Sequence, residues 1–145
     1  MALEPAPLFV DTWGWLVLED RKDPAHAAAV DLRRRQTDSG GLLVTSDYVL
    51  DEMITRLFAR RPFAEARAFC SHVLEARKVG IVAVEQVTAE RFETAYRLRL
   101  RYRDKPGISF TDLTSFTIMQ ELGIRQVMTA DAHFVQAQLG FRKLP

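Results

Sequence analysis

Two aspartates each follow a short apolar segment that is typical of a buried strand. Leu8–Val10 leads directly into Asp11, and the segment 126–129 is followed closely by Asp131. In open α/β sheets ligands bind beyond the carboxyl ends of the strands, so both carboxylates are well placed for binding a ligand. Either aspartate taken alone has the alternative role of a turn residue or a helix N-cap. Repetition of the arrangement favours a shared site.

Asp112 begins a helix that is apolar on nearly every side. The apolar residues that point in different directions around it are Leu113, Phe116, Ile118, Met119 and Leu122. With successive residues about 100° apart, Phe116 and Met119 flank the direction of Asp112, which predicts that its carboxylate faces protein rather than water. Such a charge needs a partner. The alternative is a first-turn aspartate that serves only the helix terminus, with Ser109 or Thr111 capping nearby.

A third group of acids lies on the helix expected from Asp47. Its apolar stripe is formed by Val49, Leu50, Met53, Ile54, Leu57 and Phe58. Glu52 lies off that stripe, and helical geometry does not choose it over Asp51. From periodicity alone both are interpreted as solvated surface acids. His133 is a further candidate acid or ligand, for which local packing or capping is the more common role.

Composition limits the classes of protein that this chain can represent. A length of 145 residues with 48% hydrophobic residues predicts one domain, spanning 1–145, with a substantial core. The net charge of +1 gives no global attraction to nucleic acid. A single cysteine, Cys70, indicates a reducing, intracellular setting. No basic leader and no apolar run of about 20 residues is present, so we expect a cytoplasmic protein without a membrane anchor.

Short apolar segments alternate with segments of helical period along the chain. We expect strands at 8–10, 42–45, 81–84 and 126–129, and helices at 24–36, 47–60, 63–77, 89–102 and 112–122. This alternation predicts an α/β fold with a parallel sheet. Residues 97–103 alternate basic and apolar side chains as a strand would. We favour helix there, because Thr88 is a suitable N-cap and Phe92 with Tyr96 has the spacing of a buried stripe.

Four segments together resemble the PIN-domain family, and specifically its VapC-type toxins. They are Phe9–Leu16, Val49–Met53, Ser109–Asp112 and Thr129–Phe134. The resemblance implies a three-layer α/β/α sandwich with a central parallel sheet and the acids at its carboxyl edge. It also favours Glu52 over Asp51. Departures at Trp13-Gly14, Ala130 and Ala132 put the substrate preference and the shape of the site in doubt, without removing a carboxylate.

The resemblance implies a metal-dependent endoribonuclease, the toxin of a type II (VapBC-type) toxin–antitoxin pair, with Asp11, Glu52, Asp112 and Asp131 as metal ligands. Four carboxylates within about 5 Å would repel by roughly 3 kcal/mol per pair, which a divalent cation would offset. Oxygen ligands suit Mg²⁺ or Mn²⁺, and the lack of a Cys/His cluster argues against zinc.

Several hydroxyl groups and cations are candidates for supporting roles. Thr12, Thr111 and Ser115 are candidates to orient the metal ligands, although each has the alternative role of a helix cap or core residue. Basic side chains on the helix at 56–61 and in the segment 97–105 are candidates to contact RNA phosphates, with a solvated surface or an antitoxin contact as the alternative.

The expected partners are an RNA substrate, a small antitoxin that enters the acidic groove, and a second copy of the chain. A haloacid-dehalogenase-like phosphatase is excluded, since Trp13 occupies the position of its second aspartate. A catalytically inactive PIN-like interaction module and a PIN nuclease of RNA processing stay open as alternatives.

Overall fold

The protein, described by a computed structural model over residues 4–145, forms a parallel sheet with helices on both faces. The first three residues of the predicted domain 1–145 lie outside the described residues. The elements run in the order β1 (Leu8–Val10), α1 (Thr12–Glu19), α2 (His26–Asp38), β2 (Leu43–Ser46), α3 (Asp47–Arg60), α4 (Phe63–Lys78), β3 (Val82–Glu85), α5 (Ala89–Arg101), α6 (Phe110–Leu122), β4 (Gln126–Met128), α7 (His133–Gln136) and β5 (Arg142–Leu144).

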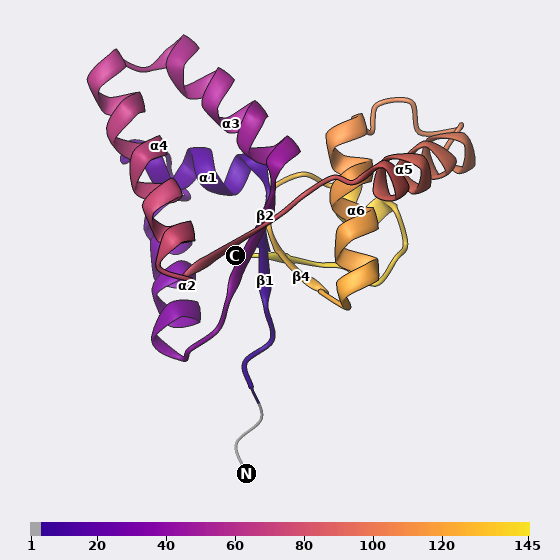
Figure 1. The fold of residues 1–145 in the computed structure, drawn as a ribbon, viewed down its shortest axis with the longest axis horizontal. Coiled ribbons are helices and arrows are strands. Elements are labelled where there is room, and N and C mark those ends of the chain that lie inside the picture. The colour runs from indigo at the N-terminus through magenta and orange to yellow at the C-terminus, as the bar shows by residue number, and fades with distance from the viewer. Residues whose placement is uncertain (1–3) are drawn as a thin grey trace.

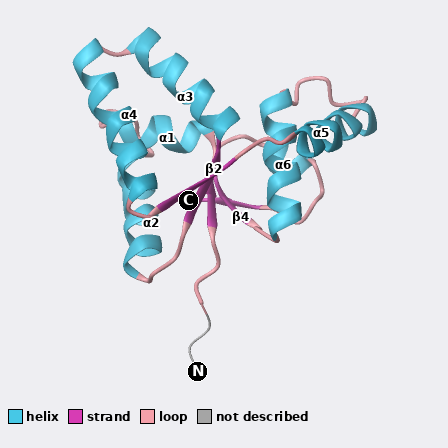
Figure 2. Cartoon of the chain, in the orientation of Figure 1, coloured by secondary structure: helices cyan, strands magenta, loops and turns pink. Residues whose placement is uncertain are grey.

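The sheet has five strands in the order β3-β2-β1-β4-β5, and every neighbouring pair is parallel. Figure 1 shows the strands between two groups of helices, with α1 to α4 on one side and α5 and α6 on the other. Figure 2 shows the same three layers by element type. The predicted α/β/α sandwich is therefore confirmed. All three residues of β1 are buried, because a central strand covered on both faces needs apolar side chains throughout.

Local sequence explains where the helices begin and end. The Ser46 hydroxyl accepts from the Val49 N–H at the start of α3, and Thr88 does the same for Arg91 at the start of α5. Helix α6 ends at Gly123, whose φ of 68° is left-handed and favours glycine. The predicted N-cap at Thr88 and the predicted end at Gly123 are confirmed.

The sequence prediction was wrong about the buried face of α5. Phe92 and Tyr96 are 46% and 53% exposed, whereas Ala95 and Leu98 are buried against α6. Residues 97–101 are nevertheless helical, as predicted, so the alternation of basic and apolar residues does not mark a strand. The helix turns Leu98 and Tyr102 inward four residues apart and leaves Leu100 in solvent.

Three elements were missing from the prediction, which had four strands rather than five. The short strand β5 lies at the edge of the sheet and carries two exposed basic residues, Arg142 and Lys143, so it lacks the apolar pattern of a strand. Helix α1 was missed because five of its eight residues are apolar and Gly14 lies inside it. Helix α7 has only four residues. Among the described residues, no helix is long and apolar enough to cross a membrane.

Candidate active site

The sheet order explains how residues from both ends of the chain meet. The central strand β1 pairs with β4, and Val10 lies opposite Met128 at their carboxyl ends. Asp11 follows β1 directly, and its N–H donates to the Met128 carbonyl over 3.3 Å. Asp131 comes three residues after the end of β4, the strand beside β1. Adjacent parallel strands thus bring Asp11 and Asp131 to one edge of the sheet, as the sequence predicted.

A pocket of about 440 Å³ opens at this edge. It is lined by Asp11, Thr12, Trp13, Glu52, Arg56, Gly107, Ser109, Asp112, Ala130, Asp131 and His133. All four acids predicted to hold a metal therefore line a single pocket, although they come from separate parts of the chain. Arg56 is the only lysine or arginine among the described residues that line it.

Thr129 connects two of the acids. Its hydroxyl donates to Asp11 Oδ2 over 2.9 Å and accepts the backbone N–H of Asp131 over 3.0 Å. Asp11 occupies the N-cap position of α1, but its side chain makes no capping hydrogen bond. The carboxylate is thus held by Thr129 and turned toward the pocket, which argues against the alternative role of a simple cap. Thr129 was not among the predicted site residues. The feature of the sequence that could have indicated it is a hydroxyl two residues before Asp131, the acid that follows β4.

Asp112 and Asp131 lie closest together, and His133 joins them. Ligand atoms of these three residues all lie within 4.8 Å of one another. Asp112 is 7% exposed in the first turn of α6, where its N–H donates to the Ser109 hydroxyl over 3.1 Å. The predictions that its carboxylate faces protein and that Ser109 caps the helix are both confirmed. Asp131 Oδ1 also accepts the backbone N–H of His133 over 2.9 Å, so this acid has the predicted turn role as well.

The structure separates Glu52 from Asp51, which helical periodicity left equivalent. Asp51 is exposed, whereas Glu52 is partly buried and lines the pocket. Glu52 also pairs with Arg56 one turn along α3, with 3.4 Å between Oε1 and Nη1. The choice of Glu52 over Asp51, which only the family resemblance made, therefore agrees with the position of the two side chains.

Burial changes the acidity of two of these carboxyl groups. Burial, supplemented by the charges of Asp131 and Glu52, raises the pKa of Asp11 to about 6 despite the hydrogen bond from Thr129. Burial and the nearby charges of Asp11 and Asp131 raise the pKa of Asp112 to about 8. Without a cation the pocket therefore cannot hold all of its carboxylates ionised at neutral pH.

Unpartnered polar atoms gather at the same place. Among the described residues, three buried side-chain atoms lack a hydrogen-bond partner: Thr12 Oγ1, Ser115 Oγ and His133 Nδ1. Thr12 and His133 line the pocket, and Ser115 lies one turn along α6 from Asp112. Buried polar atoms are almost always satisfied, so this group indicates a missing partner, such as a hydrated cation. The carboxylate-rich donor set fits a divalent cation that prefers oxygen ligands.

Of the three hydroxyl residues predicted to support the site, Thr12 lines the pocket, whereas Ser115 is buried on α6 and does not line it. Thr111 is half-buried and does not line the pocket either. Two of the predicted RNA-contacting arginines have structural partners instead. Arg61 pairs with Glu19 over 2.8 Å, and the guanidinium of Arg99 donates to the carbonyls that end α5 and shape the loop before α6.

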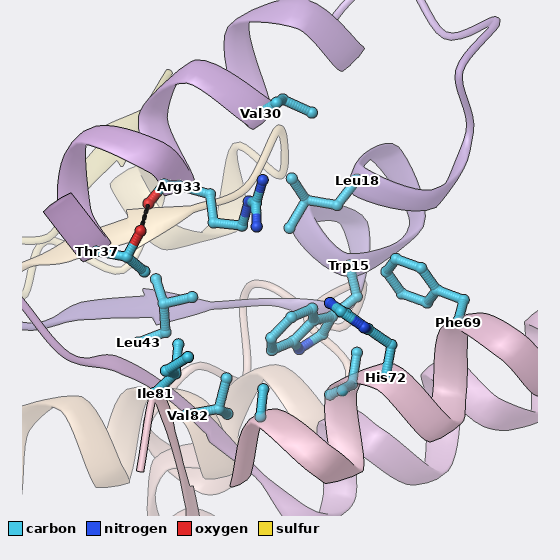
Figure 3. Close-up of a pocket in the computed structure, with 12 residues that line it drawn as sticks. Trp15, Leu18, Val30, Arg33, Thr37, Leu43, Phe69, His72, Ile81 and Val82 are labelled. Carbon is cyan, nitrogen blue, oxygen red and sulfur yellow. Dashed lines mark hydrogen bonds between the residues drawn. The ribbon is translucent and has the colours of Figure 1, made fainter. Parts of the chain in front are cut away.

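A second cavity of about 260 Å³ lies between α1, α2 and α4, beside strands β2 and β3 (Figure 3). Its walls are largely apolar and include Trp15, Leu18 and Phe69, with Arg33 and His72 as its charged or titratable residues. Trp15 is only 3% exposed and donates its indole N–H to Thr45, which confirms the packing role expected for it. Among the described residues that line this cavity there is no aspartate or glutamate.

Comparisons with known proteins agree with this architecture. The chain is 33% identical over 130 residues to the 23S rRNA-specific endonuclease VapC20 of Mycobacterium tuberculosis, a match that covers 90% of this chain and 93% of the relative. The crystal structure of that Mycobacterium tuberculosis protein, described as a sarcin-ricin loop cleaving toxin, superposes with a TM-score of 0.76 at 34% identity, covering 93% of this chain and 96% of the other.

A second solved structure is similar in fold alone. It is VapBC2 from Rickettsia felis bound to a promoter DNA fragment, with a TM-score of 0.73 at 12% identity over 95% of this chain and 98% of the other. The family model for the PIN domain matches residues 8–139, which include strands β1 to β4 and all four acids. The chain belongs to the PIN-domain family.

Proposed function

We propose that this protein is a metal-dependent endoribonuclease and the toxin of a type II toxin–antitoxin pair. The observation that carries the proposal is the convergence of Asp11, Glu52, Asp112 and Asp131 on one pocket, in a chain related along most of its length to a 23S rRNA endonuclease. The four acids are the proposed ligands of Mg²⁺ or Mn²⁺. The chemistry that such a cation supplies when bound is activation of a water for in-line attack and stabilisation of charge on the phosphate.

Residues of the chain would orient the metal ligands, exchange a proton and contact the RNA. Thr129 fixes Asp11 and Asp131 relative to each other before any ligand arrives. Burial and the neighbouring acids raise the pKa of Asp112 to about 8, so its carboxyl group would have to release a proton to hold a cation at neutral pH. Arg56 and Trp13 line the same pocket and are the proposed contacts to an RNA phosphate and a base, respectively.

The proposed partners and location follow from the same assignment. A toxin of this class needs a small cognate antitoxin that covers the acidic pocket, and we propose that the protein forms a homodimer and acts in the cytoplasm, where RNA is available. Co-purification with a small DNA-binding protein encoded beside it would support the pairing. Light scattering that gives the mass of a single chain would contradict the homodimer.

Cleavage of RNA tests the central proposal. Purified protein is incubated with intact ribosomes and with deproteinised total RNA, each with Mg²⁺ or Mn²⁺, and new 5′ ends are mapped. Discrete cleavage should disappear with EDTA and in Asp112→Asn, and should persist in Asp51→Asn, whose exposed acid lies on α3 beside Glu52. Ribosomes come first because the relatives act on 23S rRNA.

Three results would count against the proposal in different ways. Cleavage that survives both EDTA and Asp112→Asn would exclude the metal-dependent mechanism. Absence of cleavage together with absence of Mn²⁺ binding by calorimetry would favour a catalytically inactive interaction module. Cleavage confined to precursor RNAs, without growth arrest on expression, would favour a nuclease of RNA processing over a toxin.

A further inference from the structure

The imidazole of His133 faces the two closest acids of the pocket. Its Nδ1 lies 3.1 Å from Asp131 Oδ1 and 3.6 Å from Asp112 Oδ2. Despite this proximity, Nδ1 is buried and has no hydrogen-bond partner among the described residues. The nitrogen therefore approaches both carboxylates without the alignment that a hydrogen bond requires.

The position of the ring does not depend on Nδ1. The backbone N–H of His133 donates to Asp131 Oδ1 over 2.9 Å, which fixes the start of α7 beside the pocket. Gly107 lies beside the Nε2 edge of the ring, since a Cβ built on it would be in ordinary van der Waals contact with Nε2 at 3.6 Å. The backbone of His133 is thus anchored without a bond to Nδ1, which stays available to a ligand in the pocket.

We propose that His133 Nδ1 is a nitrogen ligand of the divalent cation, beside Asp112 and Asp131. This inference rests on the proposed metal-dependent function and adds a donor outside the four acids. Ligand atoms of the three residues lie within 4.8 Å of one another, so one ion can contact all three. The unpartnered Thr12 Oγ1, only 4% exposed and in the same pocket, independently indicates that a polar occupant is missing there.

A nitrogen donor changes which cation the pocket prefers. Carboxylates alone suit Mg²⁺, whereas imidazole favours transition metals such as Mn²⁺, Co²⁺ and Ni²⁺ over Mg²⁺. As a neutral donor, His133 also adds a bond to the cation without adding a negative charge to a pocket that already raises the pKa of Asp11 and Asp112. The site therefore binds Mn²⁺ or a later transition metal more tightly than Mg²⁺.

Pulsed EPR of bound Mn²⁺ tests this ligand directly, since a coordinated imidazole adds a ¹⁴N modulation to the electron spin echo. The experiment uses untagged full-length wild type, His133→Ala and the control His72→Ala, whose side chain lines the other cavity. We expect the ¹⁴N modulation in wild type and His72→Ala and its loss in His133→Ala. The Mn²⁺ dissociation constant should rise by about 10- to 100-fold in His133→Ala, and the constant for Mg²⁺ should change less.

The failure of this inference can be distinguished from the failure of the proposed function. Bound Mn²⁺ without ¹⁴N modulation in wild type, or with modulation that persists in His133→Ala, would overturn the histidine ligand and leave the carboxylate site intact. No Mn²⁺ binding by wild type would overturn both. Circular dichroism of His133→Ala checks that loss of the signal is not loss of the fold.

Discussion

Replacement of Asp112 by asparagine should stabilise the metal-free protein at alkaline pH while it removes the proposed activity. Asp112 is 7% exposed and lies near the charges of Asp11 and Asp131, which together with burial raise its pKa from 3.8 to about 8. Asparagine has nearly the same shape and no charge, so it removes the cost of ionising a carboxyl group in this position.

The size of the effect follows from the difference in pKa. Below about pH 4 the carboxyl group is protonated in both folded and unfolded chains, and the wild type bears no penalty. As the pH rises toward 8, the unfolded chain loses this proton while the folded chain keeps it, so the wild type loses stability. At about 1.4 kcal/mol per pKa unit, the full penalty is on the order of 5 kcal/mol at pH 8. Recovery of half of it would raise the Tm by roughly 5 to 10 °C.

Thermal unfolding in EDTA, followed by circular dichroism at about pH 4, 6 and 8, measures this difference. The Tm of Asp112→Asn should exceed that of the wild type at the highest pH, and the gap should close toward pH 4. Asp51→Asn, on the exposed side of α3, should show no such pH-dependent gap. Equal Tm values at pH 8, or a gap that does not change with pH, would refute the argument that the Asp112 charge is costly. Added Mn²⁺ should narrow the gap by stabilising only the wild type.

Three further changes test how the structure holds the site. Thr45→Val should lower the free energy of unfolding by about 1 to 3 kcal/mol in urea, because the Trp15 indole N–H loses its buried acceptor at 3.1 Å. Gly14→Ala should reduce the yield of folded protein and the Tm, since its Cβ would lie 2.8 Å from the Met128 carbonyl, and an unchanged Tm would contradict this contact. Arg99→Ala should cost about 2 to 4 kcal/mol and weaken Mn²⁺ binding, because three carbonyls around the loop before the Asp112 helix lose a charged donor; the carbonyls of Tyr102 and Lys105 keep a backbone donor. Unaltered Mn²⁺ affinity would separate the loop from the site.

The strands of the central sheet were predictable because they are buried on both faces. Strand β1 has the predicted bounds, β2 and β3 are each shifted by one residue, and β4 ends one residue earlier than predicted. Strand β5 was not predictable, since its pairing with β4 is a backbone contact and its side chains are mostly basic and exposed. The exposure of Phe92 and Tyr96 on α5 was also not predictable. The spacing of apolar residues identifies one face of a helix but does not say whether a neighbouring element covers that face.

The acids of the site were predictable to different degrees. The burial of Asp112 was predictable from the helix around it, which is apolar on nearly every side, whereas its place among the site acids came from the family resemblance. The choice of Glu52 required the family resemblance, because only the tertiary structure brings the other acids of the pocket near it. Thr129 and His133 gave weaker signals, since a hydroxyl before an acid and an imidazole after one both occur in ordinary turns.

The pairing of β1 with β4 has a consequence for the order of events during synthesis. Asp11 leaves the ribosome well before Thr129, which orients it from 118 positions further along the chain, and before Asp131. A nascent chain that reaches only the end of α3 therefore contains Asp11 and Glu52, but lacks Asp112 and Asp131, which line the same pocket, and Thr129. Under the proposed function, a translating ribosome is not exposed to the nuclease that it is producing until the final strands join the sheet.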